Sequence, residues 1–182
     1  MKIMKTTKVT ATVVIILTAF ISRSTFAHAA GDPKFQDDLL DHFVGKWDAT
    51  LNAHGNKFTA RYQGEWVINH QFFRFYSKTN EVVPWLGVLM EYEYFIGYHH
   101  QAKRYVVHGM SVLGSDDYEG FCYASRNGNE LTMVQKATDS TKVVIQRYTF
   151  DPTSNSWLIE SRRRISGKEG EVFLEIKLTA AK

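Results

Sequence analysis

The sequence predicts an all-β domain, closed into a single antiparallel, up-and-down β-barrel of about ten strands. Two observations predict it. Apolar and polar residues alternate with a period of two along most of the chain after Gly45, and turn-forming residues interrupt this alternation at intervals of roughly ten residues. Closing such a sheet on itself pairs its two edge strands, which would otherwise expose unpaired backbone groups. A sandwich of two sheets is the alternative architecture.

Each expected strand is bounded by residues that favour turns, chiefly Gly, Asn, Asp, Ser and Pro. The expected strands are 45–52, 57–68, 71–79, 88–98, 103–113, 117–125, 129–137, 141–150, 156–165 and 171–180. The longest interruption, residues 79–86, contains Pro84 and Trp85 and is expected to form a loop over an open barrel end. A barrel of this strand number can enclose a cavity for a small ligand.

A short helix is expected before the first strand. Asp32 suits the N-cap, Pro33 suits the first helical position, and apolar residues from Phe35 to Phe43 follow at helical spacing. The helix is expected to end at Gly45.

Residues 1–29 have the features of a cleavable signal peptide. Three lysines precede an uncharged apolar run at 9–21, and Ala27-His28-Ala29 has the small-x-small form of a cleavage site. The run is shorter than the roughly 20 residues of a spanning helix. Cleavage is therefore favoured over the alternative of an uncleaved anchor, and no stable membrane anchor is expected afterwards. Residues 30–182 would form one exported domain, either periplasmic or extracellular.

Cleavage would also change the charge of the protein. The whole chain has 22 Lys and Arg against 19 Asp and Glu, and four of the basic residues lie before residue 30. The mature chain would keep 18 basic and 19 acidic residues, a net charge of −1. Composition therefore gives no argument for binding nucleic acid. Cys122 is the only cysteine, which excludes an intrachain disulfide, and it is expected to be a small buried residue in a strand.

Short motifs carry a resemblance to known proteins. Leu40 to Trp47 reads L-x-x-x-V-G-x-W, and Gly97-Tyr98 is followed by a polar turn and the strand residues Tyr105-Val106-Val107. On these motifs, residues 39–180 resemble a family of bacterial exported lipocalin-like domains of uncharacterised function. That family lies within the calycin superfamily, with the lipocalins and fatty-acid-binding proteins. The resemblance implies a barrel closed at one end by a short helix, with Trp47 filling the barrel floor.

A haem-binding branch of the same superfamily uses a histidine late in the chain as the iron ligand. No histidine follows His108 in this sequence, so haem is not expected, and no other cofactor is expected either.

Strand alternation indicates the residues of a binding site. Arg147 is expected on an interior face with Val143 and Ile145, and Arg163 on another with Trp157, Ile159 and Ser161. A buried cation needs a partner, and a ligand carboxylate would supply one. The alternatives are that each arginine reaches water or forms a salt bridge within the barrel. The expected ligand-binding residues are Trp66, Tyr92, Tyr94, Arg147, Trp157 and Arg163.

The expected function is therefore the binding of a small hydrophobic or amphipathic molecule in a barrel cavity. A cofactor-independent isomerase, cyclase or hydrolase is the alternative, and it would require Glu91, Glu119 or His108 to face the cavity. Glu91 and Glu93 are expected on the solvated outer face, and His99-His100 in a surface turn rather than in a metal site. A solid barrel that binds a partner through its outer surface is the third hypothesis.

Overall fold

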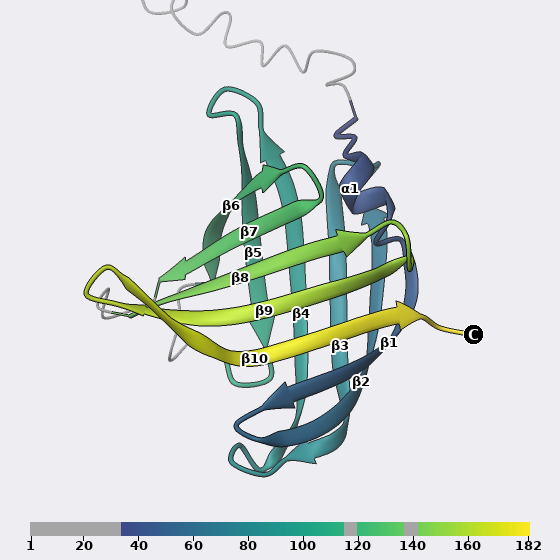
Figure 1. Ribbon diagram of the computed structural model, residues 1–182. Helices are drawn as coiled ribbons and strands as arrows, with labels where there is room; N and C mark the ends of the chain where they lie inside the picture. The colour runs from purple at the N-terminus through teal and green to yellow at the C-terminus, as the bar shows by residue number, and fades with distance from the viewer. Residues whose placement is uncertain (1–33, 115–119, 137–141) are drawn as a thin grey trace, which may run out of the picture. The chain divides into compact units, whose positions relative to one another are not determined.

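Ten strands pair in sequence order, and the first also pairs with the last, so that the sheet closes into a barrel (Figure 1). The computed structural model describes residues 34–114, 120–136 and 142–182. The strands are β1 (Gly45–Ala53), β2 (Asn56–Val67), β3 (Phe72–Val83), β4 (Val88–His99), β5 (Arg104–Ser111), β6 (Phe121–Asn127), β7 (Glu130–Lys136), β8 (Lys142–Asp151), β9 (Ser156–Ile165) and β10 (Lys168–Ala180). All neighbouring strands are antiparallel, which confirms the predicted up-and-down barrel in place of a sandwich.

Strand β3 is longer than the sequence predicted, because it runs to Val83 instead of Thr79. Val82 and Val83, whose branched side chains favour extended backbone, pair with the start of β4. Half of the predicted loop at 79–86 is therefore strand. The turn that remains is tight, and the Gly87 N–H donates to the Val83 carbonyl over 2.9 Å.

The helix that precedes the barrel, α1 (Asp38–Asp41), is a single turn of four residues. Asp37 is its N-cap, since Oδ1 of Asp37 accepts hydrogen bonds from the N–H groups of Leu39 and Leu40, each over 3.0 Å. Among the described residues, no helix is long and apolar enough to cross a membrane.

The predicted helix start was therefore wrong, because residues 34–37 are not helical and α1 begins at Asp38. The residues on which that prediction rested, Asp32 and Pro33, lie outside the described residues, as does the predicted signal peptide at 1–29.

The Asp37 carboxylate joins α1 to two barrel strands. It is buried, and it accepts hydrogen bonds from the Tyr105 hydroxyl on β5 and from Nη1 of Arg126 on β6, the latter over 3.2 Å. Arg126 also pairs with Asp38, where its hydrogen bond lowers the pKa of that carboxyl. Burial, with the hydrogen bond to Asp37, raises the pKa of Tyr105 above its ordinary value. The phenol therefore stays protonated and remains a donor.

Two further contacts hold the opposite side of the helical segment. Nε1 of Trp66, on β2, donates to Oδ1 of Asp41 over 2.7 Å. Nδ1 of His70, in the β2–β3 turn, lies 2.8 Å from the Phe35 carbonyl oxygen. The segment is thus fixed to both sides of the barrel rim.

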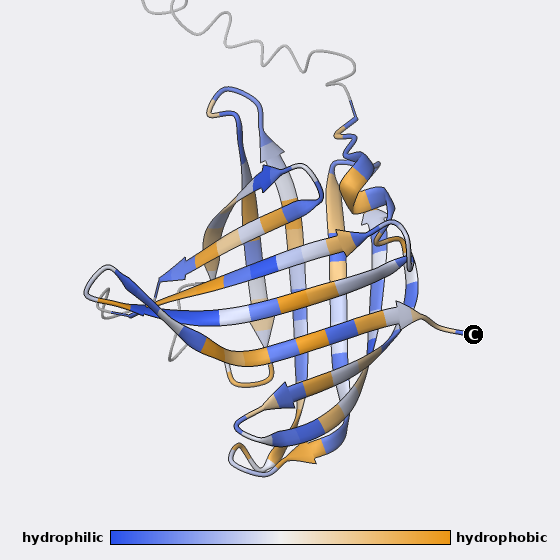
Figure 2. Cartoon of the chain, in the orientation of Figure 1, coloured by the Kyte–Doolittle hydropathy of each residue, from blue (hydrophilic) through white to orange (hydrophobic). Residues whose placement is uncertain are grey.

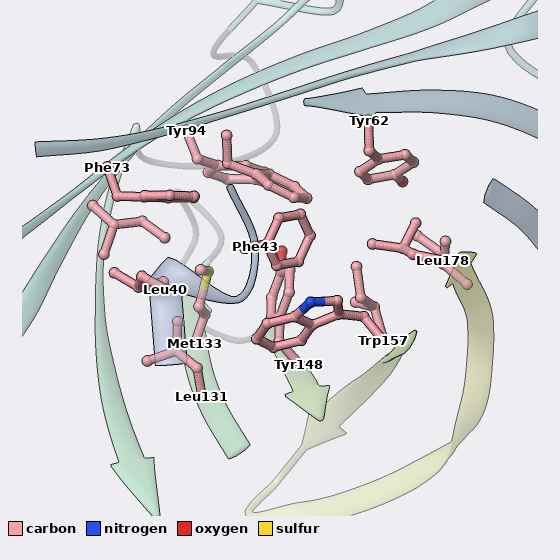
Figure 3. Packing of buried hydrophobic residues seen from close by; sticks show 14 of the residues in the cluster. Leu40, Phe43, Tyr62, Phe73, Tyr94, Leu131, Met133, Tyr148, Trp157 and Leu178 are labelled. Atoms are coloured by element: carbon pink, nitrogen blue, oxygen red, sulfur yellow. The ribbon is translucent and has the colours of Figure 1, made fainter. Parts of the chain in front are cut away.

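The barrel end beneath α1 is filled with aromatic side chains. Phe43 is 2% exposed, and its ring centroid lies 4.6 Å from that of Trp157. Figure 3 shows Phe43 in the middle of this cluster, with Tyr148 and Trp157 beside it. Nε1 of Trp47 donates to the Phe43 carbonyl over 2.9 Å, so the first strand is tied to the residue that fills the floor.

Gly64 makes this close packing feasible. A Cβ at position 64 would lie 2.3 Å from the Phe43 carbonyl oxygen and 2.7 Å from Cζ of Phe73. Any side chain on β2 at this point would push the helical segment away from the barrel.

Buried and more exposed side chains alternate along strands such as β1 and β2. Figure 2 shows a matching alternation of orange and blue bands along β10 toward its arrowhead. Of the predicted interior face of β9, Trp157, Ile159 and Ser161 are buried, whereas Arg163 is exposed near the end of the strand. The predicted interior face of β8 (Val143, Ile145 and Arg147) is wrong. The residues of β8 that pair with the interior face of β9 are Val144, Gln146, Tyr148 and Phe150.

The reason lies in the run Val143-Val144-Ile145, where apolar residues occupy both faces of the strand. Ile145 is 1% exposed, yet it lies on the outer face and is not part of the interior cluster. Hydrophobicity alone therefore does not identify the inner face here, and only the pairing with β9 does.

We predict that Asp37→Asn lowers the free energy of unfolding by about 2–3 kcal/mol. An Asn side chain can still cap the helix, but it loses the charge that orders Tyr105 and Arg126. Urea unfolding followed by tryptophan fluorescence would measure the change. Asp48→Asn is the control, because Asp48 forms only an exposed ion pair with Arg61, and we expect a loss of no more than about 0.5 kcal/mol. Equal losses in the two variants would contradict the role given to Asp37.

Candidate functional site

A cavity with two lobes lies at the barrel end opposite α1. Because β1 starts beside α1, the β1–β2 and β3–β4 turns lie at the other end, and their residues His54 and Trp85 line the space. The lobes have volumes of about 220 and 290 Å³. They share several lining residues, including Tyr92, Tyr94 and Arg163, and therefore lie side by side. Together they approach the size of cavities that bind small organic molecules.

The first lobe has mainly apolar walls, contributed by β1, β2, β3, β4, β9, β10 and the β3–β4 turn. Its apolar side chains include Leu51, Phe58, Phe75, Met90, Ile159 and Ile176. Two of the hydroxyls in this lobe already have partners. The Ser77 hydroxyl hydrogen-bonds the hydroxyl of Tyr62, and Thr79 accepts from the backbone N–H of Met90 over 2.9 Å.

The second lobe lies between β4, β5, β7, β8 and β9 and is more polar. Its lining includes Ser111, Gln135, Gln146 and Ser161. Gln146 lies where the two lobes meet, and its Oε1 accepts a hydrogen bond from the Tyr148 hydroxyl over 3.2 Å.

Tyrosines form much of the wall between the polar and apolar regions. The rings of Tyr92 and Tyr94 are parallel within 2°, with centroids 6.1 Å apart. Burial raises the pKa of Tyr62, Tyr94 and Tyr148 well above the ordinary value. These hydroxyls therefore stay neutral and act as hydrogen-bonding groups, not as bases.

The ring of Tyr94 can lie directly against β5 because residue 109 on that strand is glycine. A Cβ at this position would lie 2.6 Å from Cε1 of Tyr94, so any larger residue would push the ring into the cavity. The absence of a side chain on β5 thus sets the depth of the second lobe.

Arg163 lies near the cavity mouth and lines both lobes. Its guanidinium carbon lies 4.7 Å from the ring centroid of Phe173 on β10. Phe173 reaches the cavity because the β9–β10 register is irregular between Glu169 and Leu174, which brings both Phe173 and Leu174 to the lining. Strict alternation with Val172 and Leu174 facing inward would put Phe173 on the outer face, and the irregularity brings it to the lining instead.

The neighbouring arginines point outward and are paired with carboxylates. Arg147 and Arg164 each lie 2.8 Å from a carboxylate oxygen of Glu169, and Arg162 lies 3.6 Å from Glu160. Within the described part of the chain, no carboxylate forms an ion pair with Arg163. Arg163 is therefore the arginine with a charge available at the cavity.

The structure brings together three of the six residues predicted for the site, namely Tyr92, Tyr94 and Arg163. The other three lie elsewhere. Trp66 contacts the helical segment, Trp157 lies in the closed floor, and Arg147 pairs with Glu169 on the outer face.

Other residues line the cavity although they were not among the predicted ligand-binding residues, and they include Tyr62, Gln146, Ser161 and Phe173. The alternation of their strands is the signal that could have identified Tyr62 and Ser161. Gln146 was missed because the face of β8 was misassigned, and Phe173 because no sequence pattern marks the irregularity in β10.

Of the residues considered for catalysis, Glu91 and His108 do not line the cavity. Glu91 binds Tyr76 and Lys78, and Glu93 binds Arg74, all on the outer face. The His108 ring stacks on the exposed Phe121, with centroids 4.1 Å apart.

Glu119 lies outside the described residues. His99 and His100 are exposed where β4 ends and its turn begins. Of the described residues that line the two lobes, none is a carboxylate, and no three metal-ligating side chains gather anywhere in the described ranges.

Comparison of the sequence with models of protein families finds no match, and a search of curated proteins finds no match either. The site is therefore interpreted from its own geometry.

We predict that the Cys122 thiol is inert in the folded protein. Cys122 is 5% exposed on the inner face of β6, and burial raises the pKa of its thiol to about 12. At pH 8 we expect its reaction with 5,5′-dithiobis(2-nitrobenzoate) to be at least about 100-fold slower in buffer than in urea. As a control, Ser125→Cys in a Cys122→Ser background puts the thiol on the exposed face of the same strand, where it should react at once. Similar reaction rates in buffer for the thiol at position 122 and the thiol introduced at position 125 would contradict the assigned faces of β6.

Proposed function

We propose that the protein is an exported binding protein that holds a small hydrophobic or amphipathic molecule in the barrel cavity. The observation that carries this proposal is the pair of adjoining lobes, apolar and tyrosine-rich inside, with the charge of Arg163, which forms no ion pair among the described residues, at the lining of both. Export is proposed from the signal-peptide features of residues 1–29.

The apolar walls would supply most of the binding energy. A ligand that buries about 200 Å² of apolar surface gains about 5 kcal/mol, before the cost of its lost freedom is subtracted. The parallel faces of Tyr92 and Tyr94 suit a planar or extended apolar group, and the closed floor at Phe43 and Trp157 limits its depth.

Arg163 would orient the ligand. A guanidinium pairs with carboxylate or sulfonate through two hydrogen bonds, and its contact with the Phe173 ring restricts where it lies. An anionic amphipathic molecule would therefore enter with its apolar part first and keep its charged group at Arg163.

We also propose that the chain is a divergent member of the calycin superfamily. Its L-x-x-x-V-G-x-W motif supports this, because Gly45 has a φ of 119° where the chain turns from helix into β1, and Trp47 packs against the helical segment in the barrel floor. A short helix followed by a closed antiparallel barrel is consistent with that origin.

Binding is preferred to cofactor-independent catalysis because the described lining offers no inward pair of acid and base. It is preferred to a purely external interaction because the barrel is hollow at one end.

The proposal can be tested with the neutral fluorescent probe N-phenyl-1-naphthylamine and the mature protein, residues 30–182. We expect the probe to bind with increased fluorescence, and decanoate to displace it more strongly than decan-1-ol does. Arg163→Gln should weaken decanoate binding about tenfold and leave decan-1-ol unchanged, since only the acid pairs with the guanidinium.

Arg164→Gln is the matched control, because Arg164 lies next in sequence but points outward to Glu169. It should leave both affinities unchanged. Failure of the probe to bind, or equal effects of the two substitutions, would contradict the proposal.

A further inference from the structure

Ser161 on β9 has a buried hydroxyl without a partner. The residue is 0% exposed, and no described residue hydrogen-bonds its Oγ. An unsatisfied buried hydroxyl costs about 1–3 kcal/mol, and native proteins rarely retain one without a reason. Ser161 belongs to the residues that line the second lobe, so it lies in the wall of the cavity and not in the packed floor.

Ser161 and Arg163 lie at different depths along the same strand. Both residues lie on the interior face of β9, two residues apart, and so about 7 Å apart along the strand. Residues of the same face run from Trp157 in the floor through Ile159 to Ser161 and then to Arg163. Ser161 is therefore the deeper of the two polar groups.

The groups around Ser161 can form hydrogen bonds but carry no charge. Gln146 lies directly across on β8, and Gln135 on β7 lines the same lobe. Tyr94 adds a hydroxyl that its raised pKa keeps neutral. Arg163 is the charged residue in the described lining of this lobe, and it lies about 7 Å away along the strand. An ionic group placed at the depth of Ser161 would therefore be desolvated without a counter-charge beside it.

We infer that the second lobe is a subsite for an uncharged hydrogen-bonding group of the ligand, with Ser161 as the residue that recognises it. This inference rests on the proposed binding function and narrows the ligand class to amphipathic acids that carry a hydroxyl or similar group at the end remote from the acid. The parallel rings of Tyr92 and Tyr94 favour a flat aromatic body between the two ends.

A pair of rigid aromatic acids tests the inference directly. 6-Hydroxy-2-naphthoate has its acid and its hydroxyl at opposite ends of a fused ring, and 2-naphthoate lacks the hydroxyl. Displacement of N-phenyl-1-naphthylamine gives the affinity of each for the mature protein. We expect the native protein to prefer 6-hydroxy-2-naphthoate about tenfold.

Two substitutions of the same kind show where the preference arises. Ser161→Ala should abolish it by weakening only the hydroxylated acid, with 2-naphthoate unchanged within about twofold. Ser77→Ala, which removes a hydroxyl from the first lobe, should leave the preference intact. The midpoint of thermal unfolding should not fall in ligand-free Ser161→Ala, because the lost hydroxyl has no partner in the described fold.

The outcomes separate the two proposals. If neither acid nor the neutral probe binds, the binding function itself is refuted. If both acids bind the native protein equally, or if Ser161→Ala retains the preference, the subsite is refuted while the binding function stands. A lower unfolding midpoint for Ser161→Ala would show that the hydroxyl has a structural partner, and would also overturn the inference.

Discussion

Asp37 accepts hydrogen bonds from two backbone amides of α1, from the Tyr105 hydroxyl and from Arg126, all through one buried carboxylate. These contacts hold the helical segment across one barrel end and carry Phe43 into the floor beneath it. That end is filled by Phe43, Trp47 and Trp157, and the two large lobes of the described barrel lie at the other end. The direction from which a ligand would enter thus follows from the placement of one short helix.

The interior side chains at the two ends of the barrel differ in polarity. On β9 the interior side chains change from Trp157 and Ile159 to Ser161 and Arg163, so the wall becomes polar toward the mouth. The floor supplies close aromatic packing, with Trp157 Nε1 unpartnered there among the described residues, and the wall nearer the open end holds the unpartnered hydroxyl of Ser161. If the protein binds a ligand as proposed, a hydroxyl that contributes no hydrogen bond to the fold is free to be arranged for recognition.

The strands could be predicted from the sequence because each is a local alternation ended by turn residues. The helix cap could not, since Asp32 followed by Pro33 is as good a local signal as Asp37. What selects Asp37 is its contact with Tyr105, which is 68 residues away in sequence. Likewise, the inner face of β8 depends on its register with β9, and an apolar run on both faces hides that register from the sequence.

The side of the barrel wall on which each arginine lies could not be predicted from the sequence either, and it follows from strand pairing. Arg147 and Arg163 each follow apolar residues at a spacing of two, yet they lie on opposite sides of the barrel wall. In the run 162–164, alternation sends Arg162 and Arg164 outward, where Glu160 and Glu169 neutralise them. The remaining arginine faces inward beside Phe173. Because the acidic residues that could pair with it are engaged on the outer face, the charge of Arg163 stays available to a ligand in the cavity.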